Sequence, residues 1–225
     1  MLLVYLGVVV VLAYLIGAVP IGALVAWFHR IDISQHGSGR TGSTNVLRTI
    51  GRRAAALVLL GDFVKGSIAV GAARLLAPVL IPGGTVSLLG VTVSAVTLGA
   101  VLAAFAAVAG HIWSIYLRLV QGKWGGGRGI APALGAIMVV SPWIVLAAAV
   151  VGIPTMVISR YVSLASILGT IAASLTVVLL VLTGQLDQMG LLFVLLGAFL
   201  IAAHRDNIER LLKGTERKLG EQVKV

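Results

Sequence analysis

The chain has 225 residues, of which 59% are apolar and only 11% are charged, and its mean hydropathy is +1.09. This composition excludes an ordinary soluble globular protein, whose apolar share is about 45–50%, and predicts a single polytopic membrane domain over residues 1–225. The sequence contains no cysteine, which excludes disulfides, thiolate chemistry and cysteine-bound metal. We attribute the net charge of +10 to membrane orientation and anionic substrates or lipids rather than to nucleic acid.

Seven apolar segments approach the length of about twenty residues that a helix needs to cross a bilayer. We therefore expect an all-α integral membrane protein with seven transmembrane helices, at 3–28, 54–77, 85–109, 129–141, 142–159, 163–183 and 188–203. The 129–141 segment is short, about 20 Å at 1.5 Å per residue, so it either crosses a thinned region or is re-entrant. The first segment lacks a basic start and is too long for a signal peptide, which indicates a membrane helix.

The basic residues give an independent count of the crossings, because cytoplasmic loops carry an excess of lysine and arginine. Only Lys65 and Arg74 fall outside the alternate loops and the tail that hold the other basic residues. Seven crossings place these loops and the tail on one side, with the N-terminus outside and the C-terminus in the cytoplasm. Six crossings would distribute the basic residues over both sides. We expect a multi-pass protein of the cytoplasmic (cell inner) membrane, with its active site in cytoplasmic loops and an amphipathic tail at 204–225 that extends the last span.

The loop after the first predicted helix is rich in small and polar residues. Residues 37–48 read Gly-Ser-Gly-Arg-Thr-Gly-Ser-Thr-Asn-Val-Leu-Arg. Glycines let backbone N–H groups converge, and hydroxyl, amide and guanidinium groups add donors and charge, which is the chemistry of a phosphate or carboxylate cradle. An ordinary Gly/Ser membrane loop is the alternative. The stretch also matches G-x-G-x-x-G and, except for Ser43 in place of lysine, a P-loop, but no strand or βαβ unit surrounds it.

A second glycine-rich loop leads directly into the short 129–141 segment. Residues 121–129 read Gln-Gly-Lys-Trp-Gly-Gly-Gly-Arg-Gly. Backbone N–H groups at Gly126 and Gly127, the dipole of the following helix and the charge of Arg128 all favour an anion here. A flexible cytoplasmic loop is the alternative.

Two ionisable groups lie inside the second predicted helix. Asp62 and Lys65 are three residues apart on one face, where they can pair. An ion pair inside a membrane is a candidate functional site, but we favour a structural strut over direct substrate contact. His111, at the end of the third predicted helix, is expected to be a hydrogen-bonded helix-end residue rather than a base.

The last two polar stretches lie at 160–166 and in the tail. A turn at Arg160 precedes Ser166, which is expected to cap the next helix, while the role of Ser163 stays open. In the tail, His204 and Asn207 share one helical face, so the imidazole and the amide point the same way. A basic amphipathic tail lying on anionic lipid is the alternative for this segment.

Together these motifs resemble the bacterial acyl-phosphate:glycerol-3-phosphate acyltransferases, and the resemblance extends over nearly the whole chain. It rests on 37–45 with Arg48, 62–66, 110–111, 126–131, 160–166 and 204–211. The resemblance implies a seven-helix bundle with a cytoplasmic active site. It also implies transfer of a fatty acyl group from acyl phosphate to the 1-hydroxyl of sn-glycerol 3-phosphate, which yields lysophosphatidic acid and inorganic phosphate in the first step of phospholipid synthesis.

The resemblance further implies which residues hold each substrate. Glycerol 3-phosphate is expected to contact Ser38, Arg48, Arg128, Ser163, His204 and Asn207. The acyl phosphate is expected to contact Gly39, Arg40, Thr44, Asn45, Gly126 and Gly127. We expect the catalytic contribution to come from His204 and Asn207, and we expect no cofactor and no metal.

The chain departs from the family pattern at a few positions. Family members commonly have asparagine in place of Arg40, and lysines in place of Gly125 and Arg128, so that Lys123 is the nearest remaining lysine. Arginine keeps the positive charge at position 128, but its planar fork binds phosphate differently from the point charge of lysine.

The expected reaction needs little covalent chemistry from the protein, because an acyl phosphate is an activated mixed anhydride. The site must hold two anionic groups close together, which requires cations and oriented donors. The proton of the acceptor goes either to His204 or to a substrate phosphate. We favour the phosphate, as is proposed for the resembled family, because Arg205 and Arg210 disfavour a protonated imidazole.

A small anion transporter or lipid-binding membrane protein is the alternative function. A transporter places polar groups at the membrane midplane and is built from related halves. Only the short 129–141 segment fits that description, since the other polar stretches fall at one membrane face. We expect acyl phosphate, glycerol 3-phosphate and membrane lipid as partners, no nucleic acid, and a monomer.

Overall fold

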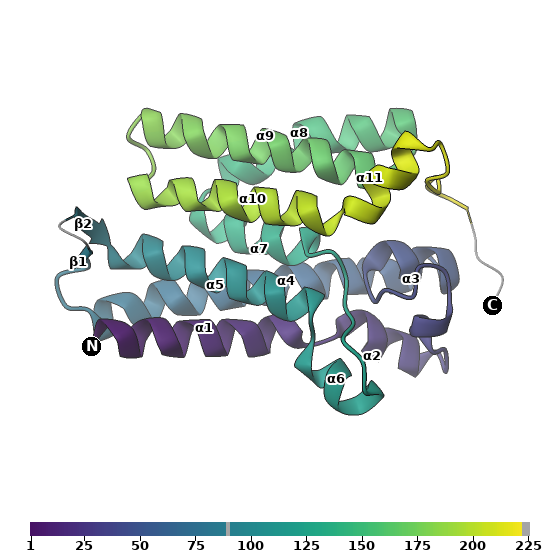
Figure 1. The fold of residues 1–225 in the computed structure, drawn as a ribbon, viewed down its shortest axis with the longest axis horizontal. Coiled ribbons are helices and arrows are strands. Elements are labelled where there is room, and N and C mark those ends of the chain that lie inside the picture. The colour runs from purple at the N-terminus through teal and green to yellow at the C-terminus, as the bar shows by residue number, and fades with distance from the viewer. Residues whose placement is uncertain (89–90, 222–225) are drawn as a thin grey trace.

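The computed structural model describes residues 1–88 and 91–221, and its long helices run roughly parallel to one axis (Figure 1). The helices are α1 (Leu2–Ala18), α2 (Ile21–Phe28), α3 (Ser43–Thr49), α4 (Arg52–Leu80), α5 (Ala95–Ile112), α6 (Ile115–Gln121), α7 (Ile130–Val140), α8 (Pro142–Ser159), α9 (Val162–Leu182), α10 (Leu192–Ala203) and α11 (Arg205–Leu212). Two short 3₁₀ helices, η1 (Ile33–Gln35) and η2 (Gln188–Leu191), and two strands, β1 (Thr85–Leu88) and β2 (Val91–Ser94), complete these elements.

The helices form two groups with α7 between them. Helices α1, α4 and α5 pack together, as do α8, α9 and α10, and α7 packs against α4, α5 and α8. The all-α membrane architecture predicted from composition is confirmed, because the outward faces of α1, α4, α8 and α9 expose leucine, isoleucine and valine side chains that only lipid can cover.

Five helical stretches of the described chain are long and apolar enough to cross a membrane, namely Leu2–Phe28, Arg52–Leu80, Ala95–Gln121, Pro142–Ser159 and Val162–Leu182. A sixth crossing results if the bent pair formed by Gln188–Ala203 and Arg205–Leu212 counts as one span. Helix α7 has only 11 residues. The start of α1 and the end of α11 lie at opposite ends of the long axis (Figure 1).

Residues 85–88 and 91–94, which we expected to be helical, form two paired antiparallel strands in which Val86 lies opposite Val93. The prediction of a helix over 85–109 was wrong for these eight residues, and residues 89–90 lie outside the described part of the chain. Gly83 and Gly84, with φ of 92° and 68°, end α4 in a conformation that favours glycine. The alternating Thr, Val and Ser residues that follow suit a strand better than a helix. Ser94 then caps α5 by accepting a hydrogen bond from the Thr97 N–H at 3.2 Å.

Close backbone contact between α4 and α7 brings the second glycine loop next to the ion pair of α4. A Cβ atom at Gly66 would overlap the carbonyl oxygen of Pro132, and one at Gly135 would overlap the carbonyl oxygen of Phe63. The Ser67 hydroxyl also donates a hydrogen bond to the Gly135 carbonyl at 2.9 Å. Small residues thus let the two helices approach as closely as backbones allow.

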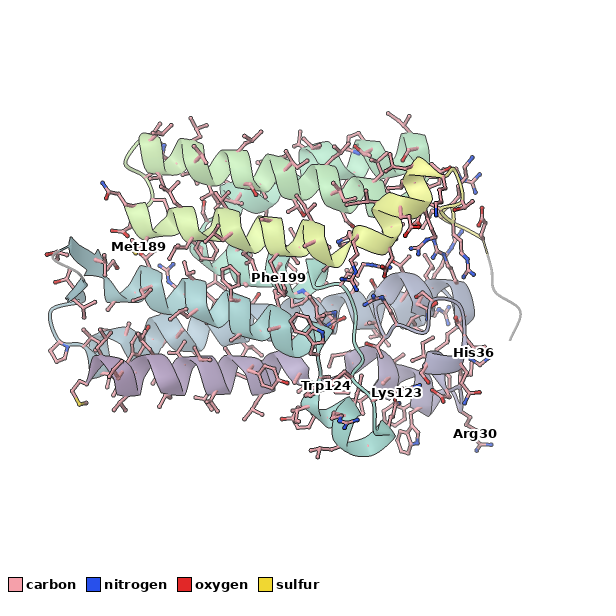
Figure 2. All side chains as sticks on the ribbon, viewed as in Figure 1. Arg30, His36, Lys123, Trp124, Met189 and Phe199 are labelled. Atoms are coloured by element: carbon pink, nitrogen blue, oxygen red, sulfur yellow. The ribbon has the colours of Figure 1, made fainter. Side chains whose placement is uncertain are left out.

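The polar loops gather at the end of the bundle opposite the hairpin. Figure 2 shows side-chain nitrogen atoms concentrated around α3, α11 and the loop before α7. The chain bends by 56° at His204, between the last apolar segment and α11, rather than continuing straight as we expected. This bend turns α11 and the residues after it toward the loops of the other helices.

Candidate active site

A cavity of about 420 Å³ lies among the polar loops and is lined by residues from six separate stretches of the sequence. The predicted site residues in its lining are Ser38, Arg40, Thr44, Asn45, Arg48, Asp62, Gly127, Arg128, Ser163, His204 and Asn207. Three predicted residues, Gly39, Gly126 and Lys65, lie outside the lining. The fold therefore brings most of the predicted residues to one place, at the end of the bundle.

The first glycine loop takes its shape from one amide side chain. Asn45 Oδ1 accepts a hydrogen bond from the Ser38 N–H at 3.1 Å, and its Nδ2 donates to the carbonyls of His36 at 3.0 Å and Arg40 at 2.9 Å. Asn45 is only 3% exposed. Its amide is thus occupied within the loop, and it shapes the cavity wall by holding 36–45 in place.

The cavity carries an excess of positive charge. Its lining contains the arginines 40, 48, 128, 210 and 217 and the carboxylates 62, 206 and 216. Within the described residues, the buried Nε atoms of Arg48 and Arg128 have no hydrogen-bond partner. Burial first, and then the nearby charges of Arg40 and Arg210, lower the pKa of Arg128 to about 10. Cations crowded in this way favour the binding of an anion.

Lys123, the nearest lysine to the second glycine loop, does not contribute to this positive charge. Its Nζ donates a hydrogen bond to the Ser34 hydroxyl at 3.2 Å, outside the cavity lining. In Figure 2 it lies beside Trp124, on the loop that leads from α6. Arg128 is therefore the cation that this loop brings to the cavity.

Sequence reasoning missed Glu216, whose side chain is only 6% exposed. Its Oε1 accepts hydrogen bonds from the Ser163 hydroxyl at 2.8 Å and from Asn207 Nδ2 at 2.6 Å, and its Oε2 accepts one from Arg210 Nε at 2.7 Å. Burial raises the pKa of the Glu216 carboxyl, but these three hydrogen bonds outweigh burial and hold the pKa below its ordinary value.

The segment around Glu216 folds back over the cavity. Arg48 Nη2 donates a hydrogen bond to the Arg217 carbonyl at 3.0 Å, and Arg160 Nη2 donates one to the Leu219 carbonyl at 2.9 Å. Gly214, with φ of 67°, makes the turn after α11. A glycine at this position commonly ends a helix, and it was the sequence signal that could have indicated a tail returning to the site.

His204 presents an open acceptor to the cavity. It is 3% exposed, and its Nδ1 lies 2.8 Å from the Leu200 carbonyl. A carbonyl only accepts, so Nδ1 carries the proton and Nε2 has a free lone pair. Burial lowers the pKa of His204, the Leu200 hydrogen bond raises it, and the charges of Arg128 and Arg40 lower it further, with a net decrease. The imidazole is therefore neutral near pH 7.

The ion pair of α4 lies at the base of the cavity, with Lys65 Nζ 2.8 Å from Asp62 Oδ1. Lys65 also donates hydrogen bonds to the Val19 carbonyl at 2.8 Å and to His111 Nδ1 at 2.9 Å. This cluster joins the end of α1 to α4 and α5 beneath the second glycine loop.

An apolar groove of about 380 Å³ continues from the cavity between α7, α8, α9 and α10. The two spaces share Leu59, Ile130, Val162 and Ser166 in their linings. The fold and the site thus define an integral membrane protein that can hold an anionic group and an apolar chain side by side at one end of its helical bundle.

Comparison with known proteins defines the family. The family model described as glycerol-3-phosphate acyltransferase matches residues 7–214. The chain is 42% identical to glycerol-3-phosphate acyltransferase 3 of Dehalococcoides mccartyi over 99% of both chains. It is 39% identical to the glycerol-3-phosphate acyltransferase of Thermoanaerobacter pseudethanolicus over 96% of both chains.

Solved structures agree with these relatives. The crystal structure of PlsY, an integral membrane glycerol 3-phosphate acyltransferase, in its glycerol 3-phosphate form matches with a TM-score of 0.76 and 33% identity over 96% of both chains. The lysophosphatidic acid form matches over the same shares with a TM-score of 0.73. The chain belongs to the glycerol-3-phosphate acyltransferase family.

Proposed function

We propose that the chain transfers a fatty acyl group from acyl phosphate to the 1-hydroxyl of sn-glycerol 3-phosphate and releases inorganic phosphate and lysophosphatidic acid. The observation that carries this proposal is the direct opening of an arginine-rich cavity onto an apolar groove. An acyl phosphate needs both environments at once, a cationic one for its phosphate and an apolar one for its chain. The PlsY structures in glycerol 3-phosphate and lysophosphatidic acid forms support the same acceptor and product here.

The acceptor binds through two kinds of contact. Arg48 and Arg128 take its phosphate, because their guanidinium groups are partly buried and have unused Nε donors. Asn207 and Ser163 already donate to Glu216, which leaves oxygen lone pairs on both residues for the glycerol hydroxyls. Ser38, exposed at the rim of the cavity, completes the acceptor contacts.

The donor phosphate binds between the two glycine loops. Thr44, Arg40 and the backbone of Gly127 face this part of the cavity. Gly39, Gly126 and Asn45 contribute through the shape of the loops, since Asn45 holds its own loop together and the two glycines lie outside the lining. The acyl chain extends into the apolar groove.

In the reaction, the 1-hydroxyl oxygen attacks the acyl carbonyl carbon. The bond from that carbon to the phosphate oxygen breaks, its electron pair stays on the phosphate, and the hydroxyl proton passes to a substrate phosphate. His204 Nε2 and Asn207 Oδ1 orient the acceptor by accepting hydrogen bonds from its hydroxyl groups before the proton moves. Such positioning is worth up to about 7–11 kcal/mol of barrier in favourable cases.

The same proposal includes a topology of seven crossings, with α7 as a short span and the N-terminus outside. The start of α1 and the end of α11 lie at opposite ends of the bundle, which supports an odd number of crossings. The concentration of arginines at the C-terminal end supports a cytoplasmic site in the cell membrane. We propose that the chain acts as a monomer, because one chain supplies both the arginines and the apolar groove that the reaction needs.

A coupled phosphate-release assay tests the donor and the acceptor together. Purified protein in lipid mesophase receives glycerol 3-phosphate with palmitoyl phosphate or with palmitoyl-CoA. We expect lysophosphatidic acid from palmitoyl phosphate alone, its loss in Ser38→Ala and Asn207→Ala, and normal turnover in Lys213→Ala, whose side chain is exposed outside the cavity. Absence of product from both donors, with anion binding retained, would instead favour a transporter.

A further inference from the structure

His111 is a buried polar side chain that faces the cavity without a role in the reaction described so far. It is 5% exposed and lies in the last turn of α5, yet it contributes to the cavity lining. A Cβ atom at Gly127 would overlap Nε2 of its imidazole, so this nitrogen lies directly behind the second glycine loop. Within residues 1–88 and 91–221, Nε2 makes no hydrogen bond to the protein.

The position of the imidazole proton follows from its neighbour. Lys65 Nζ lies 2.9 Å from His111 Nδ1, and an ammonium group has three donors and no acceptor. Nδ1 must therefore accept, and the proton of the neutral imidazole lies on Nε2. Asp62 Oδ1 is farther from Nδ1, at 3.4 Å, and lies 2.8 Å from Lys65 Nζ, so the carboxylate pairs with the lysine rather than with the imidazole.

Lys65 is held in the orientation that this tautomer requires. It donates a hydrogen bond to the Val19 carbonyl at 2.8 Å, and its Nζ lies 2.8 Å from Asp62 Oδ1 in an ion pair, so groups at the end of α1 and on α4 hold it against His111. The helix of His111 is fixed in turn, because α5 packs closely against α1 and α4. The Nε2–H donor consequently points at the cavity in a rigid setting, which is the requirement for a preorganised anion contact.

We propose that His111 is a phosphate-binding residue whose Nε2–H donates a hydrogen bond to the phosphate of the acyl donor beside Gly127. This proposal rests on the proposed function and adds a donor to its phosphate site. When the carbonyl carbon is attacked and its bond to the phosphate oxygen breaks, the electron pair moves onto the phosphate. The hydrogen bond strengthens with that charge, and His111 keeps its proton throughout.

Two substitutions separate the donor at Nε2 from the acceptor at Nδ1. His111→Asn keeps an oxygen near the Nδ1 position for Lys65 but has no group that reaches the position of Nε2. His111→Gln places an amide N–H near the Nε2 position. Loss of one hydrogen bond to a charged group predicts a kcat/KM for palmitoyl phosphate about 10- to 100-fold lower in His111→Asn. We expect His111→Gln to recover much of this loss, and the KM for glycerol 3-phosphate to stay within about twofold in both.

A binding measurement keeps the test independent of turnover. In ¹⁵N-labelled protein, with the His111 signal assigned by its absence from His111→Asn, we expect protonation at Nε2 and a shift of that signal on titration with inorganic phosphate. If wild-type protein uses no acyl phosphate but this shift occurs, the proposed function fails while the phosphate contact stands. The proposal is overturned by protonation at Nδ1, by a signal unmoved by phosphate, or by equal loss of activity and of thermal stability in both variants.

Discussion

Two charged clusters border the same cavity, and they are built on opposite principles. The cluster of Asp62, Lys65 and His111 lies within helices, and its one carboxylate and one ammonium balance each other at 2.8 Å. The loop cluster around Arg48 and Arg128 is unbalanced, with guanidinium nitrogens that have no partner in the described part of the chain. Charged side chains inside a membrane bundle are tolerated only when they are paired. Charged side chains at its polar end can remain unpaired until the substrate binds. Position in the bundle thus separates structural charge from binding charge.

The largest effect is expected from breaking the balanced cluster. Asp62→Asn leaves the buried ammonium of Lys65 uncompensated, and loss of one partner of a buried ion pair costs about 3–5 kcal/mol of unfolding free energy. We expect a much lower midpoint of thermal unfolding in detergent, measured by the fluorescence of the tryptophans.

The matched control removes both charges at once. Asp62→Asn combined with Lys65→Met should be more stable than Asp62→Asn alone, because no buried charge remains unpaired. Equal midpoints for wild-type protein and Asp62→Asn would contradict a structural role for the pair and assign it to the substrate instead.

The second largest effect is expected from the unbalanced cluster and concerns activity rather than stability. Arg128→Gln removes a partly buried cation proposed to hold phosphate, and loss of a desolvated charge contact of this kind costs about 2–5 kcal/mol. We therefore expect kcat/KM for glycerol 3-phosphate to fall about 30- to 5,000-fold, with an unchanged or raised unfolding midpoint, since Arg40 and Arg210 no longer repel a third cation.

Arg128→Lys sharpens this test. It keeps the charge and loses the planar fork, so we expect an intermediate kcat/KM in steady-state phosphate release. A marked loss of thermal stability in Arg128→Gln would show instead that this arginine is paired in the same manner as Lys65.

Glu216 combines both features, because its carboxylate is paired with Arg210 but lies inside the cationic loop cluster. Glu216→Gln weakens the contacts to Ser163, Asn207 and Arg210, so the orientation of Asn207 is less fixed. We expect a KM for glycerol 3-phosphate about tenfold higher, in line with the value of a hydrogen bond to a charged group, and little change in the KM for palmitoyl phosphate. Glu209→Gln, on the exposed face of α11, is the matched control and should leave both constants unchanged.

The pH dependence of the tail follows from the same carboxylate. The pKa of Glu216 in the folded protein lies below the ordinary value of 4.5. Its contribution to the stability of the folded tail is therefore complete at higher pH and is lost as pH falls through the folded pKa. Hydrogen exchange of residues 213–221, corrected for the intrinsic rate, should show constant protection from pH 7 to 5 and a loss below pH 4.5. Protection of the same residues in Glu216→Gln should be low at every pH. Protection equal to that of wild type would contradict the proposal that Glu216 holds the tail in place.

Much of the fold was predictable because a bilayer requires long apolar segments, which hydropathy detects directly. The strand pair of β1 and β2 was not, since its valines and leucines give an apolar hydropathy window while the β-branched Val and Thr residues favour a strand. The bend at His204 was also missed. A helical pattern continues on both sides of it, and only the packing of α11 against α9 turns the chain.

The candidate site was predictable as a set of polar stretches but not as a geometry. Gly126, Gly127 and Arg128 stand out in an apolar chain, and so do His204 and Asn207. By contrast, the contact between Lys65 and His111 joins positions 46 residues apart, and no local pattern indicates it. Glu216 was hidden for the same reason, because its partner Ser163 lies 53 residues away and the tail composition alone suggests a lipid surface.

The smallest effect is expected where the cationic cluster meets solvent. Arg40 Nη2 lies 3.4 Å from Asp206 Oδ2, and both side chains are partly exposed, so the pair is worth about 0–1 kcal/mol. Asp206→Asn frees Arg40 and increases the positive field of the donor site. We expect the KM for palmitoyl phosphate to fall about two- to threefold at low salt, with no change in the unfolding midpoint.

Screening provides the check on this explanation, because exposed charges more than a Debye length apart, about 3 Å at 1 M salt, interact little. The difference between Asp206→Asn and wild type should therefore vanish in 1 M sodium chloride. Asp187→Asn, which removes a carboxylate from the opposite end of the bundle, should leave the KM unchanged at any salt concentration. A salt-independent gain in Asp206→Asn would mean that Asp206 acts by holding Arg40 in place rather than by its charge.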